Sequence, residues 1–228
     1  MNIPCYTEYM ENAIAPTAEQ MPIIMPELGK WSKALVWGKT VVFFKIDNDH
    51  SPENPLENES AQGTIYSFSH RHGNFIGYDK EDMIEDLLKN KEAVRLSYFE
   101  HGNSLWMVAE APTPPGVEFQ WDGVRFAGLW VPDEEVLDNI GDVQGEERRT
   151  KLLAYAAGVV EQFTAWCNGE VYGYEIERYD LKEDEDGNNI LSRSYYSSMQ
   201  DAETDSCSGY YGWDDFTKEV ESSVRAEF

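Results

Sequence analysis

The sequence has few cysteines and no long apolar run, and each shortage excludes a class of protein. Its three cysteines are far apart and odd in number, whereas a secreted disulfide scaffold carries more of them, in pairs. No Cys-x-x-Cys pair is present, so zinc-ligand spacing is absent. The chain also lacks a run of about 18 apolar residues and the basic and apolar segments of a signal peptide. We therefore expect a cytoplasmic protein with no membrane partner.

Basic residues are scarce as well. The chain has 18 Lys and Arg residues against 43 Asp and Glu residues, a net charge of −25. Residues 1–110 hold 17 acidic and 9 basic residues, whereas residues 111–228 hold 26 and 9. Such a surface repels nucleic acid, whose binding requires Lys and Arg against phosphate. The charge excludes direct nucleic-acid binding and favours a basic protein partner. Because the excess of acidic residues lies in residues 111–228, we expect that half to carry the function.

Catalytic motifs are also missing. The sequence contains no Gly-x-Ser-x-Gly, no His-Glu-x-x-His, no deaminase signature and no phosphate-binding P-loop. We therefore assign no catalytic residue and expect no cofactor, and the pattern favours a protein that is not an enzyme.

Histidines offer one candidate for metal binding. His70 and His72 would share one face of a strand, with His50 or His101 as a third ligand. A polar strand end is the alternative interpretation, and we assign no metal.

An acidic turn, KEDEDGNN, suggests a calcium loop but fails position by position. With Gly187 at the sixth position, the first and twelfth positions are Lys182 and Arg193, where carboxylates are needed. The segment is better interpreted as a solvated hairpin turn.

What is present is a composition that folds. Hydrophobic residues make up 41% and aromatic residues 13% of the chain, too much for a disordered acidic tail. Periodicity and turn signals predict an α+β fold, a mostly antiparallel sheet with a long helix packed on it. We expect an irregular lead-in over 1–39 and a single domain over 40–228, with sub-lobes 40–110 and 111–228 as the alternative. The predicted strands are 40–46, 64–69, 94–100, 104–110, 117–121, 124–131, 170–179 and 190–197. Strands 94–100 and 104–110 should form a hairpin around His101-Gly102-Asn103, and strands 117–121 and 124–131 a second one around Asp122-Gly123. The predicted helices are 79–90, 132–140, 146–168 and 213–228.

Rows of carboxylates are the most informative feature. On a helix, side chains at i and i+4 lie about 5–6 Å apart, close to the roughly 7 Å between phosphates along one strand. Such rows can imitate a nucleic-acid backbone, although a plain solvated acidic face explains them too. The candidate partner-binding carboxylates are Glu81, Asp82, Glu85, Asp86, Asp133, Glu134, Glu135, Asp138, Asp184, Glu185 and Asp186.

Aromatic residues are dense near the C-terminus. Tyr210, Tyr211 and Trp213 complete the candidate partner-binding set, because such residues provide contact area at interfaces. Ordinary half-exposed strand tyrosines are the alternative.

Three segments carry a resemblance: QWDGVRFAGLWVPDEEVLDNI (120–140), TAWCNGEVYGYEIE (164–177) and TDSCSGYYGWDD (204–215). They resemble uncharacterised accessory proteins of tailed phages and plasmids, over roughly the last 110 residues. Where that family reads DSCWGFYG, this chain has Ser208 in place of an aromatic residue. The resemblance implies a mobile-element gene outside the virion. It carries over no activity and no catalytic residue.

These observations predict a non-enzymatic inhibitor of a host nucleic-acid-processing defence complex, of the anti-CRISPR or anti-restriction type. Its partner would be a basic host protein or ribonucleoprotein complex. One alternative is a small-ligand protein or an enzyme of unknown class, such as one that binds a signalling nucleotide where tyrosines converge with Arg125, Arg178 and Arg193. The other is a homodimeric scaffold that uses the aromatic C-terminal face.

Overall fold

A computed structural model of the chain describes residues 22–57, 62–77, 81–89, 92–199 and 202–228. The first 21 residues of the expected lead-in lie outside these ranges. Two four-stranded antiparallel sheets and their helices form an α+β fold, as the sequence predicts. The strands are β1 (Leu35–Trp37), β2 (Thr40–Asn48), β3 (Thr64–Ser67), β4 (Val94–His101), β5 (Asn103–Val108), β6 (Gly123–Val131), β7 (Val171–Asp180) and β8 (Glu203–Tyr211). The helices are α1 (Glu81–Lys89), α2 (Phe119–Asp122), α3 (Glu134–Ile140), α4 (Gly145–Cys167), α5 (Arg193–Ser197) and α6 (Trp213–Ala226).

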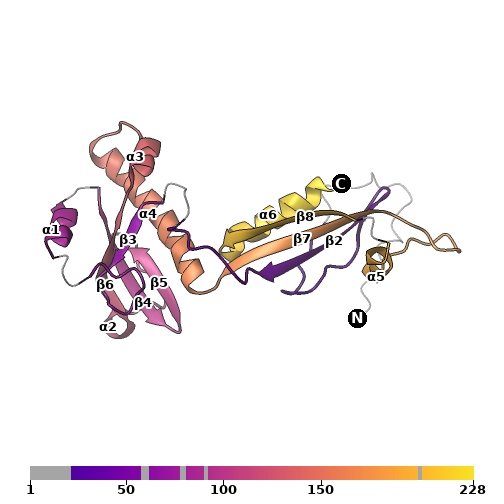
Figure 1. Cartoon of the computed structure of the whole chain (residues 1–228), viewed down its shortest axis with the longest axis horizontal. Coiled ribbons are helices and arrows are strands. Elements are labelled where there is room, and N and C mark those ends of the chain that lie inside the picture. The colour runs from indigo at the N-terminus through magenta and orange to yellow at the C-terminus, as the bar shows by residue number, and fades with distance from the viewer. Residues whose placement is uncertain (1–21, 58–61, 78–80, 90–91, 200–201) are drawn as a thin grey trace. The chain divides into compact units, whose positions relative to one another are not determined.

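The chain forms two compact units that interleave along the sequence (Figure 1). The first unit comprises residues 1–47, 174–207 and 217–228, and the second comprises 48–173 and 208–216. The point between residues 110 and 111, considered above as a sub-lobe boundary, falls inside the second unit.

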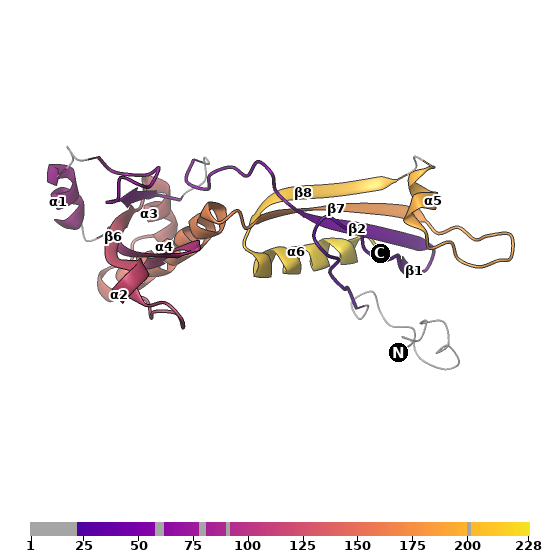
Figure 2. The same cartoon turned by 90° about the horizontal axis from the view of Figure 1, so that it is seen from below.

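The first unit is built on the sheet β1-β2-β7-β8. Alternation along β2 and β7 buries both faces: Val41 and Phe43 pack with Tyr179 and Tyr196 on one face. On the other face, α6 runs along the sheet (Figures 1 and 2), and the hydroxyls of Tyr174 and Ser223 lie 3.0 Å apart.

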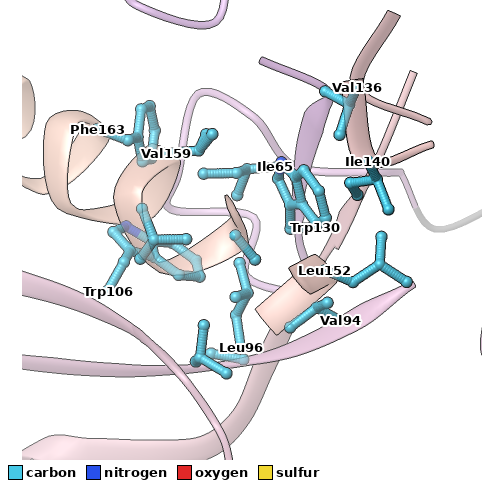
Figure 3. Packing of buried hydrophobic residues seen from close by; sticks show 14 residues of the cluster. Ile65, Val94, Leu96, Trp106, Trp130, Val136, Ile140, Leu152, Val159 and Phe163 are labelled. Carbon is cyan, nitrogen blue, oxygen red and sulfur yellow. The ribbon is translucent and has the colours of Figure 1, made fainter. Parts of the chain in front are cut away.

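The second unit is built on the sheet β3-β6-β4-β5 with α4 packed against it. Figure 3 shows Trp106 and Trp130 among the aliphatic side chains of this core. The buried members from the strands are Ile65, Val94, Leu96, Trp106, Val108, Ala127 and Trp130, and those from the helices are Val136, Ile140, Leu152, Ala156, Val159, Val160 and Phe163. The long helix and its place on a sheet agree with the prediction.

Helix α4 also covers the outer edge of β5. The amide of Asn168 contacts both backbone groups of Ser104, at 2.8 and 2.9 Å. Thr164 Oγ1 accepts from the backbone N of Trp106 at 3.1 Å. These side chains stand where another strand would pair, so they protect an exposed sheet edge.

Two local predictions are wrong. Residues 117–121 and 124–131 do not form a hairpin around Gly123: residues 119–122 form α2, and β6 pairs with β3 and β4. Gly123 is extended (φ −136°), and a Cβ there would lie 2.5 Å from the Phe119 ring. The glycine therefore permits a close approach to that ring, not a turn.

The predicted strand at 190–197 is also wrong. This segment includes α5 instead. The helix is held in place by the hydroxyl of Tyr196, which donates to Ile190 O at 2.9 Å and accepts from the backbone N of Lys182 at 3.0 Å. The turn before it does form, with Gly187 at φ 83°.

Candidate functional site

The predicted carboxylates lie on three separate elements. Glu81, Asp82, Glu85 and Asp86 are on α1; Asp133, Glu134, Glu135 and Asp138 are at α3; and Asp184, Glu185 and Asp186 are in the turn after β7. The α1 and α3 groups belong to the second unit and the turn to the first.

The row on α1 is partly compensated by a lysine. Lys89 Nζ lies 3.5 Å from carboxylate oxygens of both Glu85 and Asp86. Lys89 therefore offsets part of the like-charge repulsion expected for acidic i,i+4 pairs.

Two of the predicted carboxylates hold the backbone. Asp133 caps α3, accepting from the backbone N of Val136 at 2.8 Å and from that of Gly63 at 3.0 Å. Asp184 organises its turn by accepting from the backbone of Asp186 and Asn188, at 3.0 and 2.8 Å. Hydrogen bonds from Asn188 hold the pKa of Asp184 below its ordinary value. These two side chains hold backbone groups although they are exposed, as Glu185 and Asp186 are.

The densest uncompensated acidity continues from α3 into the start of α4. Between Asp133 and Glu147 the chain has seven acidic residues and no Lys or Arg. Two helix N-termini favour the glutamates in their first turns. We call six of them, all exposed, the acidic corner: Glu134, Glu135, Asp138, Asp142, Glu146 and Glu147. Sequence reasoning missed the last three, which extending the charge count past residue 140 would have found. Asp133 is exposed too but is left out, because its side chain caps α3.

The cations that follow this segment are bonded to the body of the second unit. Arg148 contacts Glu92 and donates to Gly141 O at 3.2 Å. Arg149 donates to Ala93 O at 3.0 Å and to Glu110 at 2.6 Å. Lys151 Nζ donates to Ile140 O at 3.3 Å and lies 3.8 Å from the carboxylate of Glu147. The two arginines thus pair with Glu92 and Glu110 outside the acidic corner, and Lys151 offsets part of the charge of Glu147.

The predicted aromatic face is largely packed. Tyr211 donates its hydroxyl to Glu53 O at 2.7 Å. The ring of Trp213 meets that of Tyr172 edge-on at 5.1 Å, and Tyr210 contacts Phe216 at 5.6 Å. These rings form an internal cluster, although Trp213 keeps 40% of its surface exposed.

Acidity is shared by the two units. By sequence count the first has 18 acidic and 9 basic residues and the second has 25 and 9, net −9 and −16. That is about one net negative charge per ten residues and one per eight. The excess after residue 110 therefore does not correspond to one folded half.

The three arginines expected to gather around a nucleotide belong to two different units. Arg178 is paired with Glu203 and Arg193 with Glu177 in the first unit. Arg125 lies over the Phe119 ring, 4.8 Å from its centroid, in the second unit. Each of the three thus has a partner within its own unit.

A different pocket forms at one end of the second sheet. It has a volume of about 800 Å³ and is lined by segments 68–72, 98–102 and 121–127. We call it the histidine pocket, because His70, His72 and His101 line it and the chain has four histidines in all. Its other lining side chains with polar or aromatic groups are Phe68, Ser69, Arg71, Tyr98, Glu100, Trp121, Asp122 and Phe126.

The interior of the pocket is fixed by a hydrogen bond between Ser67 and His72. The Ser67 side chain is fully buried, and its Oγ lies 2.6 Å from His72 Nδ1. The imidazole meets the rings of Tyr98 and Trp106 edge-on, at 4.6 and 5.2 Å. Burial lowers the pKa of His72, which favours the neutral ring. A buried Ser67 does not offer a nucleophile to solvent.

The mouth of the pocket consists of exposed charged groups held by neighbours. Glu100 accepts from the Tyr98 hydroxyl at 3.0 Å and lies 3.8 Å from Arg71. Asp122 Oδ2 lies 2.9 Å from His101 Nδ1. Each carboxylate therefore orients a cationic or potentially cationic side chain.

The wall of the pocket is shaped by a bulge in β6. Leu96 on β4 faces Gly128 and Tyr98 faces Val124, so three residues of β6 lie opposite Ser97 alone. Ser97 Oγ donates to Arg125 O at 2.7 Å and holds the bulge. Bulges re-aim side chains near functional sites. Here Phe126 meets Phe68 edge-on at 5.0 Å, beside the pocket.

The metal interpretation of the histidines gains no support. His70 and His72 lie in a turn after β3, where His72 N donates to Ser69 O, and not on one face of a strand. Among the described residues, no group of three His, Cys, Asp or Glu side chains is placed to hold a metal ion.

No helix within the described ranges is long and apolar enough to cross a bilayer.

Comparison with known proteins adds no relative: no family model, curated protein or solved structure matches the chain.

Proposed function

We propose that this chain is a non-enzymatic acidic inhibitor that binds a basic, nucleic-acid-binding host protein or ribonucleoprotein through the acidic corner. The observation that carries the proposal is the segment from Asp133 to Glu147. It holds seven acidic residues without a base. Of the cations that follow, Arg148 and Arg149 pair with Glu92 and Glu110 outside the segment, and Lys151 lies 3.8 Å from Glu147.

The geometry suits mimicry of a nucleic-acid backbone. Glu134 and Asp138 stand at i and i+4 on α3, so their Cβ atoms are about 5–6 Å apart, near phosphate spacing. Such carboxylates would occupy a groove that Lys and Arg line for phosphate. The partner would lose access to its nucleic acid. Because the sequence resembles proteins of mobile elements, we propose a host defence complex of the CRISPR or restriction type as the target.

The test is a capture experiment with three charge-matched variants. Immobilised protein is incubated with nuclease-treated bacterial lysate, and bound proteins are identified and eluted with salt or with duplex DNA. Each variant replaces three exposed acids by Lys, which changes the net charge from −25 to −19. The acidic-corner variant is E134K/E135K/D138K; the controls are D82K/E85K/D86K on α1 and E183K/E185K/D186K in the first unit.

We expect the captured proteins to be nucleic-acid-binding proteins that salt and duplex DNA release. Both compete with the acidic corner for the Lys and Arg side chains of the partner. The acidic-corner variant should weaken capture at least about tenfold, whereas the controls keep it. Equal losses in all three variants would show that bulk charge alone acts, and capture that resists salt and DNA would contradict mimicry.

A further inference from the structure

The histidine pocket gathers more basic-type side chains than carboxylates. Four basic-type side chains line it, three histidines and Arg71, against the two carboxylates Glu100 and Asp122. In the whole sequence, acids outnumber Lys, Arg and His together by 43 to 22. Both carboxylates already face a partner, at 3.8 and 2.9 Å. An anion entering the pocket would meet N–H donors of the Arg71 guanidinium and of the imidazole rings, in competition with the two carboxylates.

Aromatic rings line the same space. Trp121 keeps 76% of its surface exposed and Phe126 keeps 40%, although both are large apolar side chains. The guanidinium of Arg95 lies over the Phe126 ring, 5.3 Å from its centroid. Exposed rings beside cations suit a planar ligand that stacks and carries negative charge.

The pocket is also of a suitable size. Its volume of about 800 Å³ falls within the roughly 300–1,000 Å³ of sites that hold small molecules. A close approach of strands keeps its wall in place, because a Cβ on Gly128 would lie 2.2 Å from Tyr66 O. Gly128 is therefore held against β3, and the bulge between Gly128 and Val124 starts at this fixed contact.

We propose that the histidine pocket binds a small planar anion of the nucleoside monophosphate class. The base lies against the aromatic side of the pocket, where Trp121 and Phe126 are exposed, and the phosphate lies at the mouth near Arg71. The guanidinium of Arg71 can form charge-assisted hydrogen bonds with phosphate oxygens, and imidazole N–H groups can donate further ones. A polynucleotide fits poorly, because its further phosphates would meet the surrounding negative surface.

This site is separate from the acidic corner and shares no residue with it. The nucleotide interpretation considered from sequence placed the ligand at Arg125, Arg178 and Arg193, none of which lines the pocket. The proposal therefore stands or fails independently of the proposed inhibitor function.

The test is isothermal titration calorimetry of the full chain with four probes at pH 6.5: AMP, adenosine, inorganic phosphate and the cation agmatine. AMP should bind at least about tenfold more tightly than adenosine or phosphate alone, because each carries half of the recognised chemistry. Equal affinity for AMP and adenosine would overturn the anionic part, and tighter binding of agmatine would overturn the proposal as a whole.

Matched variants locate the site. R71A and W121A should each weaken AMP binding at least about tenfold. R125A removes the same charge from the neighbouring strand outside the pocket and should leave affinity within about twofold. Because the Arg71 side chain is 71% exposed and Trp121 is mostly exposed, both variants should keep the native circular dichroism spectrum. No heat of AMP binding, or an equal loss in R125A, would overturn the proposal.

Discussion

Arg193 donates two parallel hydrogen bonds to Glu177, from Nε to Oε2 at 2.7 Å and from Nη2 to Oε1 at 2.5 Å. Glu177 is only 7% exposed, and the hydroxyl of Tyr179 donates a third bond to it at 3.1 Å. The guanidinium also stacks on Trp31, 3.4 Å from the ring centroid. One side chain thereby connects α5 and the segment around Trp31 to β7.

Removing this arginine should destabilise the first unit. R193M leaves the buried carboxylate of Glu177 without its counter-charge, which should cost about 2–4 kcal/mol, near the range for broken buried pairs. Urea unfolding followed by circular dichroism measures the loss. The double variant E177Q/R193M should recover part of it, because no charge is then left buried. A loss below about 0.5 kcal/mol, the scale of an exposed pair, would contradict the structural role.

Two glycines should respond in opposite directions to alanine. At Gly128 a Cβ would lie 2.2 Å from Tyr66 O, so G128A should destabilise the second unit by about 1–3 kcal/mol through overpacking. Gly158 lies within α4 with nothing within 4 Å of such a Cβ, so G158A should stabilise by about 0.5–1 kcal/mol. Thermal unfolding of the two single variants measures the sign of each change in stability. A G128A variant that is more stable than the parent would contradict the close contact between Gly128 and Tyr66.

The titration of His72 should depend on two neighbours. Burial lowers its pKa below 6.5, Glu100 opposes that shift and Arg71 adds to it. By NMR titration, E100Q should lower the pKa of His72 further, and R71A should raise it.

The same shift has a consequence for stability. Because the folded pKa of His72 lies below the unfolded value of 6.5, the unfolded chain binds the proton more tightly. The contribution of His72 to stability is therefore complete above pH 6.5 and declines as the pH falls below it. The variant H72Q should lose less stability than the parent between pH 7 and pH 5.

Cys167 should be a slow thiol. Although the residue as a whole is exposed, burial raises the pKa of its thiol from 9.0 to about 11. In the variant C5S/C207S, its reaction with Ellman's reagent at pH 8 should be about 100-fold slower folded than unfolded, because each pKa unit lowers the thiolate fraction tenfold. Similar rates in native buffer and in guanidinium chloride would contradict the burial.

Local signals predicted much of the fold. The long helix, the β4–β5 hairpin with Gly102 at φ 83°, and β7 all agree with the structure. In each case the deciding pattern lies within about 25 residues of chain. Alternation or helical periodicity is then visible, because one face is buried and the other is not.

Long-range pairing accounts for the errors. Asp122-Gly123 has the sequence of a hairpin turn, but the partners of β6 lie about 30 and 60 residues away. Strand β8 was missed because residues 203–209 are exposed on both faces, so no apolar alternation marks them. The histidine pocket gathers three segments, and only the neighbours His70 and His72 were visible as a pair.

The interleaved connectivity imposes an order on folding. Strand β2 is complete at Asn48, yet its partner β7 begins at Val171, after nearly the whole second unit has been made. During synthesis the edge of β2 that pairs with β7 must wait, with β1 paired on its other side, while the second unit folds behind it. Once folded, that unit shortens the flexible loop between β2 and β7 and lowers the entropy lost on closing it. Variants that slow folding of the second unit should therefore expose β2 to aggregation on the ribosome, even when the mature protein is stable.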